Sequence, residues 1–329
     1  MEGPAPDFMI IGAPKAGTTA LHAALSRHPD VAMSTPKEPK YWLCEDAPPP
    51  AYVGPGDAHS QQEWVWRRED YQAIFAHDDG PYGSHERLRG EATPFYLWSP
   101  GARRRITTEL PDVRLIAVVR DPIDRAYSNW MHLWCDGLEP EADFLTAFSR
   151  ERERIRRGWA PFWRYADLGR YGEQLADLHQ RIDPAQILVL RYRELVDTPR
   201  AAVDKAARFL GIRTGKVDAI PADNSRSYVE PGWRPRLVGP VIRTGAWLGQ
   251  FAPPQVWRAA EPRLHPLLRS EHGAHRPRLT PEARAALIPA FAEDIDLLAQ
   301  VTGDDYGAWL DPESRGSFRE RSAALSAVP

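Results

Sequence analysis

The stretch MIIGAPKAGTTAL, residues 9–21, joins an apolar run to a glycine-containing turn and then to a helix-like pattern. Gly12 and Gly17 have the spacing of the phosphate-binding P-loop, G-x-x-x-x-G-K-[ST], but Thr18 stands where that motif has its lysine. The lysine of this stretch is Lys15, three residues after the first glycine. The pattern predicts a strand, an anion-binding turn and a helix, and it leaves open which nucleotide needs a lysine at that point.

Strand-like and helix-like segments alternate along the first two thirds of the chain. This alternation predicts an α/β, P-loop-like, three-layer fold with a central, mostly parallel sheet flanked by helices. The loops after Ile11, Gly90 and Val119 are expected on one rim, where parallel sheets bind ligands. The predicted strands are 8–12, 31–33, 88–92, 113–119 and 186–190, and the predicted helices follow Gly17 and span 68–77, 99–109, 122–135, 142–157, 168–181, 199–210 and 280–301.

The chain is expected to form a single domain over residues 1–312. Within it, a Pro-rich loop at 45–65 is expected on the substrate side, and a helical cover is expected at 213–310. The Arg- and Trp-containing region 234–270 favours a packed cover, with peripheral contact to a membrane surface as the alternative. Residues 313–329 are polar and are expected to form a flexible tail.

Bulk properties exclude several classes of function. A net charge of −3 over 329 residues gives no global basic field for nucleic acid. Two cysteines, Cys44 and Cys135, make neither a disulfide framework nor a metal cluster, and the ten histidines show no metal-ligand spacing. No apolar run reaches the length of a transmembrane helix, and the N-terminus lacks the features of a secretory signal. We therefore expect a cytoplasmic protein without a metal.

A second motif, VVRDPIDRAYSNW at 118–130, places a cation at a strand end and then starts a helix. Arg120 and Ser128 are about two helical turns apart and can grip one phosphate together. An ATP-hydrolysing enzyme would instead need a Mg²⁺-holding acidic residue at a strand end of this kind. An arginine here suggests a second phosphate on the same nucleotide.

Lys15-Ala16-Gly17-Thr18-Thr19 and the Arg120–Ser128 segment together resemble the PAPS-dependent sulfotransferases, most closely the heparan sulfate type and its bacterial relatives. The resemblance covers residues 8 to about 211, in order and at the expected spacing. It implies in-line transfer of a sulfuryl group from 3′-phosphoadenosine 5′-phosphosulfate (PAPS) to an acceptor hydroxyl or similar nucleophile, without a metal. The product would be 3′-phosphoadenosine 5′-phosphate (PAP). The first loop would bind the 5′-phosphosulfate, and the second segment would bind the 3′-phosphate.

The resemblance also implies residue roles. Lys15 would stabilise the leaving phosphate, and Glu38 in STPKEPKYW would deprotonate the acceptor. Glu91 in GEATPFYLW is a second candidate base, and Ala92 replaces the lysine of the family pattern E-K-T-P-x-Y, which leaves Lys15 as the main candidate cation. The candidate nucleotide-binding residues are Pro14, Lys15, Ala16, Gly17, Thr18, Thr19, Arg120, Ser128, Tyr171, Asn224, Ser225 and Arg226, and the candidate acceptor-binding residues are Lys37, Lys40, Trp42 and Glu91.

Two other interpretations stay open at this point. One is an ATP-dependent kinase or NTPase, and the other is a non-catalytic nucleotide-binding protein on the same fold. The acceptor of a sulfotransferase could be a small molecule, a carbohydrate or a lipid-linked sugar, since twelve tryptophans suit a sugar face or an aromatic compound equally. The Ala-, Arg- and Pro-rich composition is typical of a high-GC bacterium, which favours a glycolipid or a secondary metabolite. Oligomeric state cannot be read from the sequence.

Overall fold

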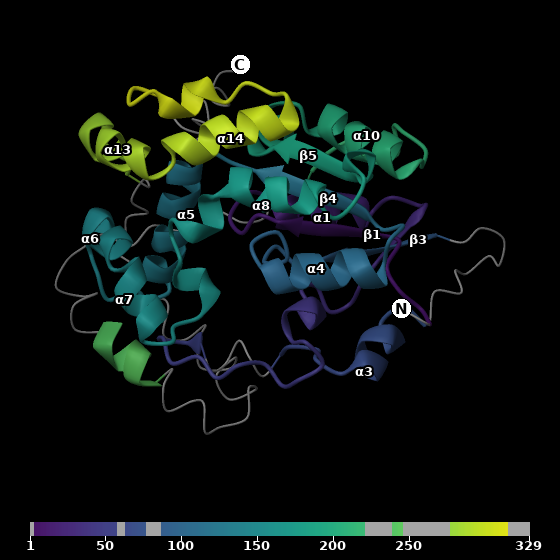
Figure 1. The fold of residues 1–329 in the computed structure, drawn as a ribbon, viewed down its shortest axis with the longest axis horizontal. Coiled ribbons are helices and arrows are strands. Elements are labelled where there is room, and N and C mark those ends of the chain that lie inside the picture. Colours follow the sequence, from purple (N-terminus) through teal and green to yellow (C-terminus); the bar gives the residue numbers. More distant parts are fainter. Residues whose placement is uncertain (1–2, 58–62, 77–86, 221–238, 246–276, 315–329) are drawn as a thin grey trace, which may run out of the picture.

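The computed structural model describes residues 3–57, 63–76, 87–220, 239–245 and 277–314. Its centre is a five-stranded sheet with the order β2-β3-β1-β4-β5, in which every pairing is parallel (Figure 1). The predicted α/β fold is confirmed, and the sheet is parallel throughout. The strands are β1 (Phe8–Gly12), β2 (Val31–Met33), β3 (Leu88–Ala92), β4 (Arg114–Val119) and β5 (Ile187–Arg191).

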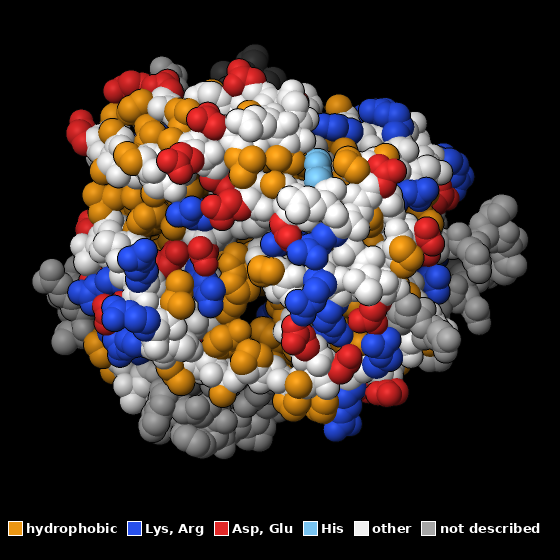
Figure 2. All heavy atoms as spheres, viewed as in Figure 1, with side chains coloured by type: hydrophobic (Ala, Val, Ile, Leu, Met, Phe, Trp, Pro, Cys, Tyr) orange, Lys and Arg blue, Asp and Glu red, His pale blue; other side chains and the backbone are white. Residues whose placement is uncertain are grey.

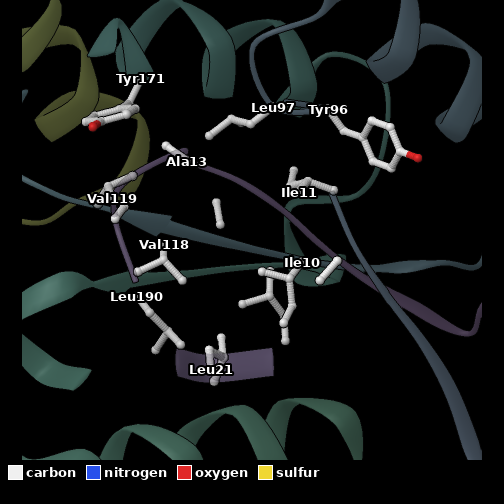
Figure 3. Close-up of a cluster of buried hydrophobic side chains, with 14 of the residues drawn as sticks. Ile10, Ile11, Ala13, Leu21, Tyr96, Leu97, Val118, Val119, Tyr171 and Leu190 are labelled. Carbon is white, nitrogen blue, oxygen red and sulfur yellow. The ribbon is translucent and has the colours of Figure 1, made fainter. Parts of the chain in front are cut away.

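Helices cover both faces of this sheet. Figure 3 shows Leu21 of the first helix on one side of the strand side chains Ile10, Val118 and Leu190, and Tyr171 on the other side of the same cluster. All of these side chains are buried, and each contributes roughly 1.5–3 kcal/mol by leaving water. The helices are α1 (Thr18–Leu25), α3 (Arg68–Ala73), α4 (Pro100–Glu109), α5 (Pro122–Cys135), α6 (Phe144–Ser149), α7 (Glu151–Arg156), α8 (Tyr171–His179), α9 (Tyr192–Asp197), α10 (Pro199–Leu210), α13 (Pro281–Leu287) and α14 (Ala292–Thr302).

Strand order places the ligand-binding rim. After β1 the chain builds β2 and β3 on one side of it, and it then crosses to form β4 and β5 on the other side. The register between β1 and β4 shifts between Ile10 and Gly12, where the first loop leaves the sheet. Ligands of open parallel sheets bind outside the carboxyl ends of the strands at such a reversal. The loops after β1 and β4 therefore emerge side by side.

Several predicted helices have different boundaries. The predicted helix 142–157 divides into α6 and α7 at Arg150, where φ is −83° and ψ is 1°. The predicted helix 280–301 is interrupted by a 3-10 turn, η5 (Ile288–Ala290), because Pro289 cannot donate a backbone hydrogen bond in a helix interior. The short helix α9 was not predicted, and its first turn is closed by the Glu194 carboxylate, which accepts the Arg191 amide at 2.9 Å.

The C-terminal helix α14 docks on α8, as Figure 1 shows. A Cβ atom on Gly172 would lie 2.3 Å from the Asp294 carbonyl oxygen, so only glycine permits this approach. The Asp294 carboxylate accepts the amides of Gly172 at 3.0 Å and Glu173 at 2.9 Å, and it thereby caps the start of α8. The helical cover at 213–310 and the single domain over residues 1–312 stay predictions. Most of the predicted tail, from residue 315, lies outside the described residues.

Within the described ranges, no helix has both the length and the apolar character needed to cross a membrane. The same part of the chain holds no group of three or more His, Cys, Asp or Glu side chains placed to bind a metal ion.

Candidate active site

The loop after β1 forms an anion cradle. The Ala13 amide donates to the Val118 carbonyl at 2.8 Å, and the Ala16 amide donates to the Ala13 carbonyl at 3.1 Å, which ties the turn to β4. Gly17 then caps α1 with φ 96°, a left-handed conformation that favours glycine. Because α1 begins at Thr18, the first amides of this helix point out of its N-terminus, where the macrodipole is positive. The stretch Pro14–Thr19 can therefore surround an anionic group.

Lys15 faces α5. Its Nζ atom lies 3.3 Å from Nδ1 of His132, and the other ring nitrogen of His132 is 3.7 Å from the Asp136 carboxylate. The Lys15 carbonyl accepts a hydrogen bond from Nη1 of Arg120 at 3.0 Å. His132 was not predicted as a site residue, although it lies four residues after Ser128 and therefore on the same face of α5.

Arg120 and Ser128 are both almost fully buried, with 5% and 4% exposure. Arg120 leaves the carboxyl end of β4, and its guanidinium stacks 4.5 Å over the ring of Tyr192. Tyr192 was also missed, although it follows the carboxyl end of β5 on the same rim. Tyr171 begins α8 and is 1% exposed; burial raises the pKa of its hydroxyl, and the nearby Arg125 and Arg120 oppose that rise.

Glu38 lies on a backbone segment held against β3. Its amide donates to the Ala92 carbonyl at 3.1 Å, and its carboxylate pairs with the Lys37 ammonium. Glu38 has φ 59° and Lys40 has φ 62°, and Lys15 across the rim has φ 68°. Non-glycine residues adopt this conformation at a cost of about 1–3 kcal/mol, and such residues gather at functional sites. Among the described residues, Glu45 and Asp46 are the others in this conformation, so three of the five lie on this rim, which supports it as a candidate catalytic centre.

Charge around Glu38 is mixed. Burial lowers the pKa of Lys40, and the Glu38 carboxylate opposes that change; the Lys40 ammonium lies 5.3 Å over the ring of Trp64. His22 of α1 also lies near Glu38. Burial, and then the Lys37 charge, lower its pKa to about 4, so its ring is neutral near pH 7.

The side chains of Glu91 and Trp42, predicted as acceptor contacts, are fully buried. The Glu91 carboxylate accepts hydrogen bonds from the Tyr71 hydroxyl and, at 2.8 Å, from Thr93. The Trp42 indole donates to the Tyr71 hydroxyl at 2.9 Å. In this structure both side chains pack next to the segment that carries Glu38, and their contact with an acceptor stays a prediction.

Burial raises the pKa of Glu91 to about 7, against the opposing hydrogen bonds from Tyr71, Tyr96 and Thr93. The folded state therefore binds this proton more tightly than the unfolded state, whose pKa is near 4.5. The stabilising contribution of the protonated carboxyl is complete below about pH 4.5 and is lost as the pH rises to about 7.

We expect the free energy of unfolding to fall by up to about 3 kcal/mol from this carboxyl between pH 4.5 and pH 7. Glu91→Gln should remove this slope, which denaturant unfolding across that pH range would measure. Glu45→Gln, an exposed change in a neighbouring segment, is the control. An equally steep slope in Glu91→Gln would show that other groups cause it.

Aromatic side chains extend from Lys15 toward the surface. The ring of Phe162 lies 5.4 Å from the ring of His132 and 6.1 Å from the ring of Phe95. Next to them, the Arg164 guanidinium stacks 4.7 Å over Trp98. On the face drawn in Figure 2, the surface is hollowed beside α4, between hydrophobic side chains and a group of Lys and Arg side chains.

Three predicted nucleotide-binding residues, Asn224, Ser225 and Arg226, lie outside the described residues, as does most of 234–270.

Comparisons with known proteins agree on one family. The model described as "Sulfotransferase family" matches residues 6–215. Membrane-associated sulfotransferase kil1 of Dictyostelium discoideum is 32% identical over 126 residues, which are 38% of this chain and 22% of that protein. Heparan sulfate glucosamine 3-O-sulfotransferase 3A1 of Mus musculus is 27% identical over 209 residues, which are 63% of this chain and 46% of that protein. This chain therefore spans less than half the length of these two relatives.

One solved structure is similar over nearly its whole length. The crystal structure of a sulfotransferase from Alicyclobacillus acidocaldarius superposes with a TM-score of 0.69 at 28% identity. The match covers 93% of this chain and 98% of that one.

Proposed function

This chain belongs to the sulfotransferase family, and we propose that it moves a sulfuryl group from PAPS to a hydroxyl or similar nucleophile of an acceptor. In the proposed step the acceptor oxygen forms a bond to sulfur in line, while the bond from sulfur to the 5′-phosphate oxygen breaks. The acceptor proton goes to Glu38, the electron pair of the broken bond stays on PAP, and PAP leaves.

The observation that carries this proposal is the meeting of two cationic sites on one rim. The Lys15 loop leaves β1, Arg120 leaves β4, and Nη1 of Arg120 donates to the Lys15 carbonyl at 3.0 Å. A nucleotide with one anionic group at the α1 N-terminus and another beside Arg120 and Ser128 fits this arrangement. PAPS carries its phosphosulfate and its 3′-phosphate on opposite sides of the ribose, and the residues present fit it.

The kinase or NTPase interpretation meets an obstacle at Asp121, the acidic residue next to the end of β4. One oxygen of its carboxylate accepts the amides of Ile123 and Asp124, and the other pairs with Arg284. A carboxylate committed in this way is poorly suited to hold Mg²⁺. Transfer of a sulfuryl group from PAPS to an acceptor would exclude the non-catalytic interpretation.

The acceptor, its sulfated position and a bacterial source are part of the proposal. Similarity to a heparan sulfate enzyme supports a hydroxyl acceptor on a carbohydrate, and the aromatic surroundings of Phe162 and Trp98 support a sugar or an aromatic ring. Lys37 and Lys40 beside Glu38 suit an acceptor with a negative charge. Small-molecule and lipid-linked acceptors belong in the same screen.

We expect PAP to raise the melting temperature of this protein and ADP with Mg²⁺ to leave it unchanged. A ligand at about 100 times its dissociation constant stabilises by roughly 2.7 kcal/mol, which is a readable shift. Arg120→Met should weaken PAP by about 10- to 100-fold, because a hydrogen bond to a charged group contributes about 1.5–3 kcal/mol. Adenosine 5′-phosphate should bind this variant nearly as well as it binds the unchanged protein.

Arg157→Gln is the matched control, since Arg157 is exposed and its described contacts are local, an ion pair with Glu153 at 3.2 Å and a stack 5.7 Å over Trp159. A shift with ADP only when Mg²⁺ is present would favour the kinase interpretation. Equal weakening of PAP and adenosine 5′-phosphate by Arg120→Met would show that Arg120 does not bind the 3′-phosphate. PAP binding without transfer to any acceptor would leave the non-catalytic interpretation.

A further inference from the structure

A buried arginine from the C-terminal part of the chain reaches the start of α5. Arg284 of α13 is 3% exposed, and its guanidinium pairs with the Asp121 carboxylate and lies 3.3 Å from the Asp124 carboxylate. Its remaining donors go to the carbonyls of Asp311 at 3.0 Å and Trp309 at 3.0 Å. Arg284 lies beyond residues 6–215, the part that the family model matches. It is therefore held in one geometry by two separate segments.

The two carboxylates create an electrostatic problem for the proposed nucleotide site. Asp121 directly follows Arg120 and is the N-cap of α5, the helix that carries Ser128, and Asp124 lies in the first turn of that helix. Each is only 5% exposed. Charges interact strongly at this depth, so ionised carboxylates here would oppose a 3′-phosphate bound by Arg120 and Ser128.

Asp121 stabilises the start of α5 as its N-cap, because its carboxylate accepts the amides of Ile123 at 2.9 Å and Asp124 at 3.2 Å. Burial, and then the charge of Asp124, raise the pKa of Asp121, and the Arg284 guanidinium opposes that rise. The arginine thus offsets the negative charge that the cap brings to the helix start.

We infer that Arg284 is a positioning residue for the 3′-phosphate site: by pairing with Asp121 and Asp124, it lets Arg120 and Ser128 hold a doubly charged phosphate. This inference rests on the proposed function, since it requires that Arg120 and Ser128 bind the 3′-phosphate of PAPS. It gives the C-terminal part of the chain a role in choosing the nucleotide, in addition to covering α8.

The test measures dissociation constants of PAP and adenosine 5′-phosphate by titration calorimetry at pH 7.5. Arg284→Gln should weaken the affinity for PAP by about tenfold, which corresponds to about 1.4 kcal/mol. The affinity for adenosine 5′-phosphate should change by less than about threefold. Arg284→Lys, which keeps the charge, should retain most of the PAP affinity. Arg157→Gln, at the C-cap of α7, is again the matched surface control and should change the affinity for neither ligand.

Two readouts separate an electrostatic role from a purely structural one. Adding Asp124→Asn to Arg284→Gln should restore PAP binding, because it removes one of the uncompensated carboxylates. The PAP deficit of Arg284→Gln relative to the unchanged protein should also grow from pH 6 to pH 8.5, as the Asp121 carboxyl ionises, because burial raises its pKa to about 6 and the lost arginine no longer opposes that rise. The charged and titratable groups facing Asp121 are Arg284 of α13, Asp124 of α5, the adjacent Arg120 and Tyr171 of α8. Comparison at each pH cancels the titration of PAP itself.

The outcomes distinguish this inference from the proposed function. If the unchanged protein binds PAP no better than adenosine 5′-phosphate, the proposed 3′-phosphate site fails. Suppose instead that the unchanged protein prefers PAP. If Arg284→Gln keeps that preference, only the role of Arg284 fails. The same holds if Arg284→Gln weakens the binding of both ligands equally at every pH and Asp124→Asn does not restore it. Should Arg284→Gln not fold, the single variant Asp124→Asn decides: PAP should bind about two- to threefold more tightly, and unchanged or weaker binding overturns the inference.

Discussion

Lys15→Met is expected to lower kcat for sulfuryl transfer by about 10²- to 10³-fold, the usual effect of removing one donor aimed at developing charge. The charge develops on the oxygen that joins sulfur to the leaving phosphate. The Lys15 backbone has φ 68°, its carbonyl is held by Arg120, and its ammonium lies 3.3 Å from His132. This constraint fixes the direction of the side chain, so methionine of similar length fills its space without supplying the charge.

The measurement is PAP release from PAPS in a single turnover, first with water as acceptor and then with a panel of phenols, sugars and glycolipids. PAP affinity should fall much less than kcat, because the α1 N-terminus and Arg120 still bind the nucleotide. Lys205→Met on α10 is the matched control, since Lys205 pairs with Glu194 at 3.1 Å and is 42% exposed. Normal turnover in Lys15→Met would remove Lys15 from the mechanism.

The fold was predictable largely because β1 and β4, at the centre of the sheet, are short and mostly apolar runs. FMIIG and RLIAVV read directly as buried strands, and the observed β1 and β4 coincide with the predicted segments to within one residue. The order of strands was not readable, since it depends on which neighbours pair across the sheet. The break at Pro289 has a local cause and could have been predicted. The break at Arg150 has a tertiary cause, because the Glu151 carboxylate that begins α7 accepts the amides of Ala166 and Asp167.

The residues of the candidate site also differ in how far the sequence could predict them. Motifs in which neighbours in sequence act together could be recognised, as in the loop around Lys15. Partners that come from distant segments gave no local signal: His132 is 117 residues from Lys15, and Arg284 is 163 residues from Asp121. The burial of Trp42 gave no local signal either, since the direction of a side chain in the short 3-10 turn Tyr41–Leu43 depends on the residues packed against it, here Tyr71.

Glu38→Gln is expected to lower kcat by about 10²- to 10⁴-fold, the range for losing a general base, while PAP affinity stays unchanged. The Glu38 side chain is 28% exposed, and the segment is held through its backbone, where the Glu38 amide donates to Ala92. Glutamine preserves this hydrogen bond and the shape of the side chain, so the loss should fall on proton transfer.

The measurement pairs single-turnover transfer with PAP titration, and Glu45→Gln, an exposed change in the same segment, is the control. Lost PAP binding in Glu38→Gln would assign Glu38 a structural role. Full transfer in Glu38→Gln together with lost transfer in Glu91→Gln would move the base to Glu91. That second outcome would require the buried Glu91 carboxyl to exchange its hydrogen bonds with Tyr71 and Thr93 for one with the acceptor. A buried carboxyl gives up such bonds at a cost of about 1–3 kcal/mol each, and we therefore expect Glu38, whose side chain is partly exposed, to be the base.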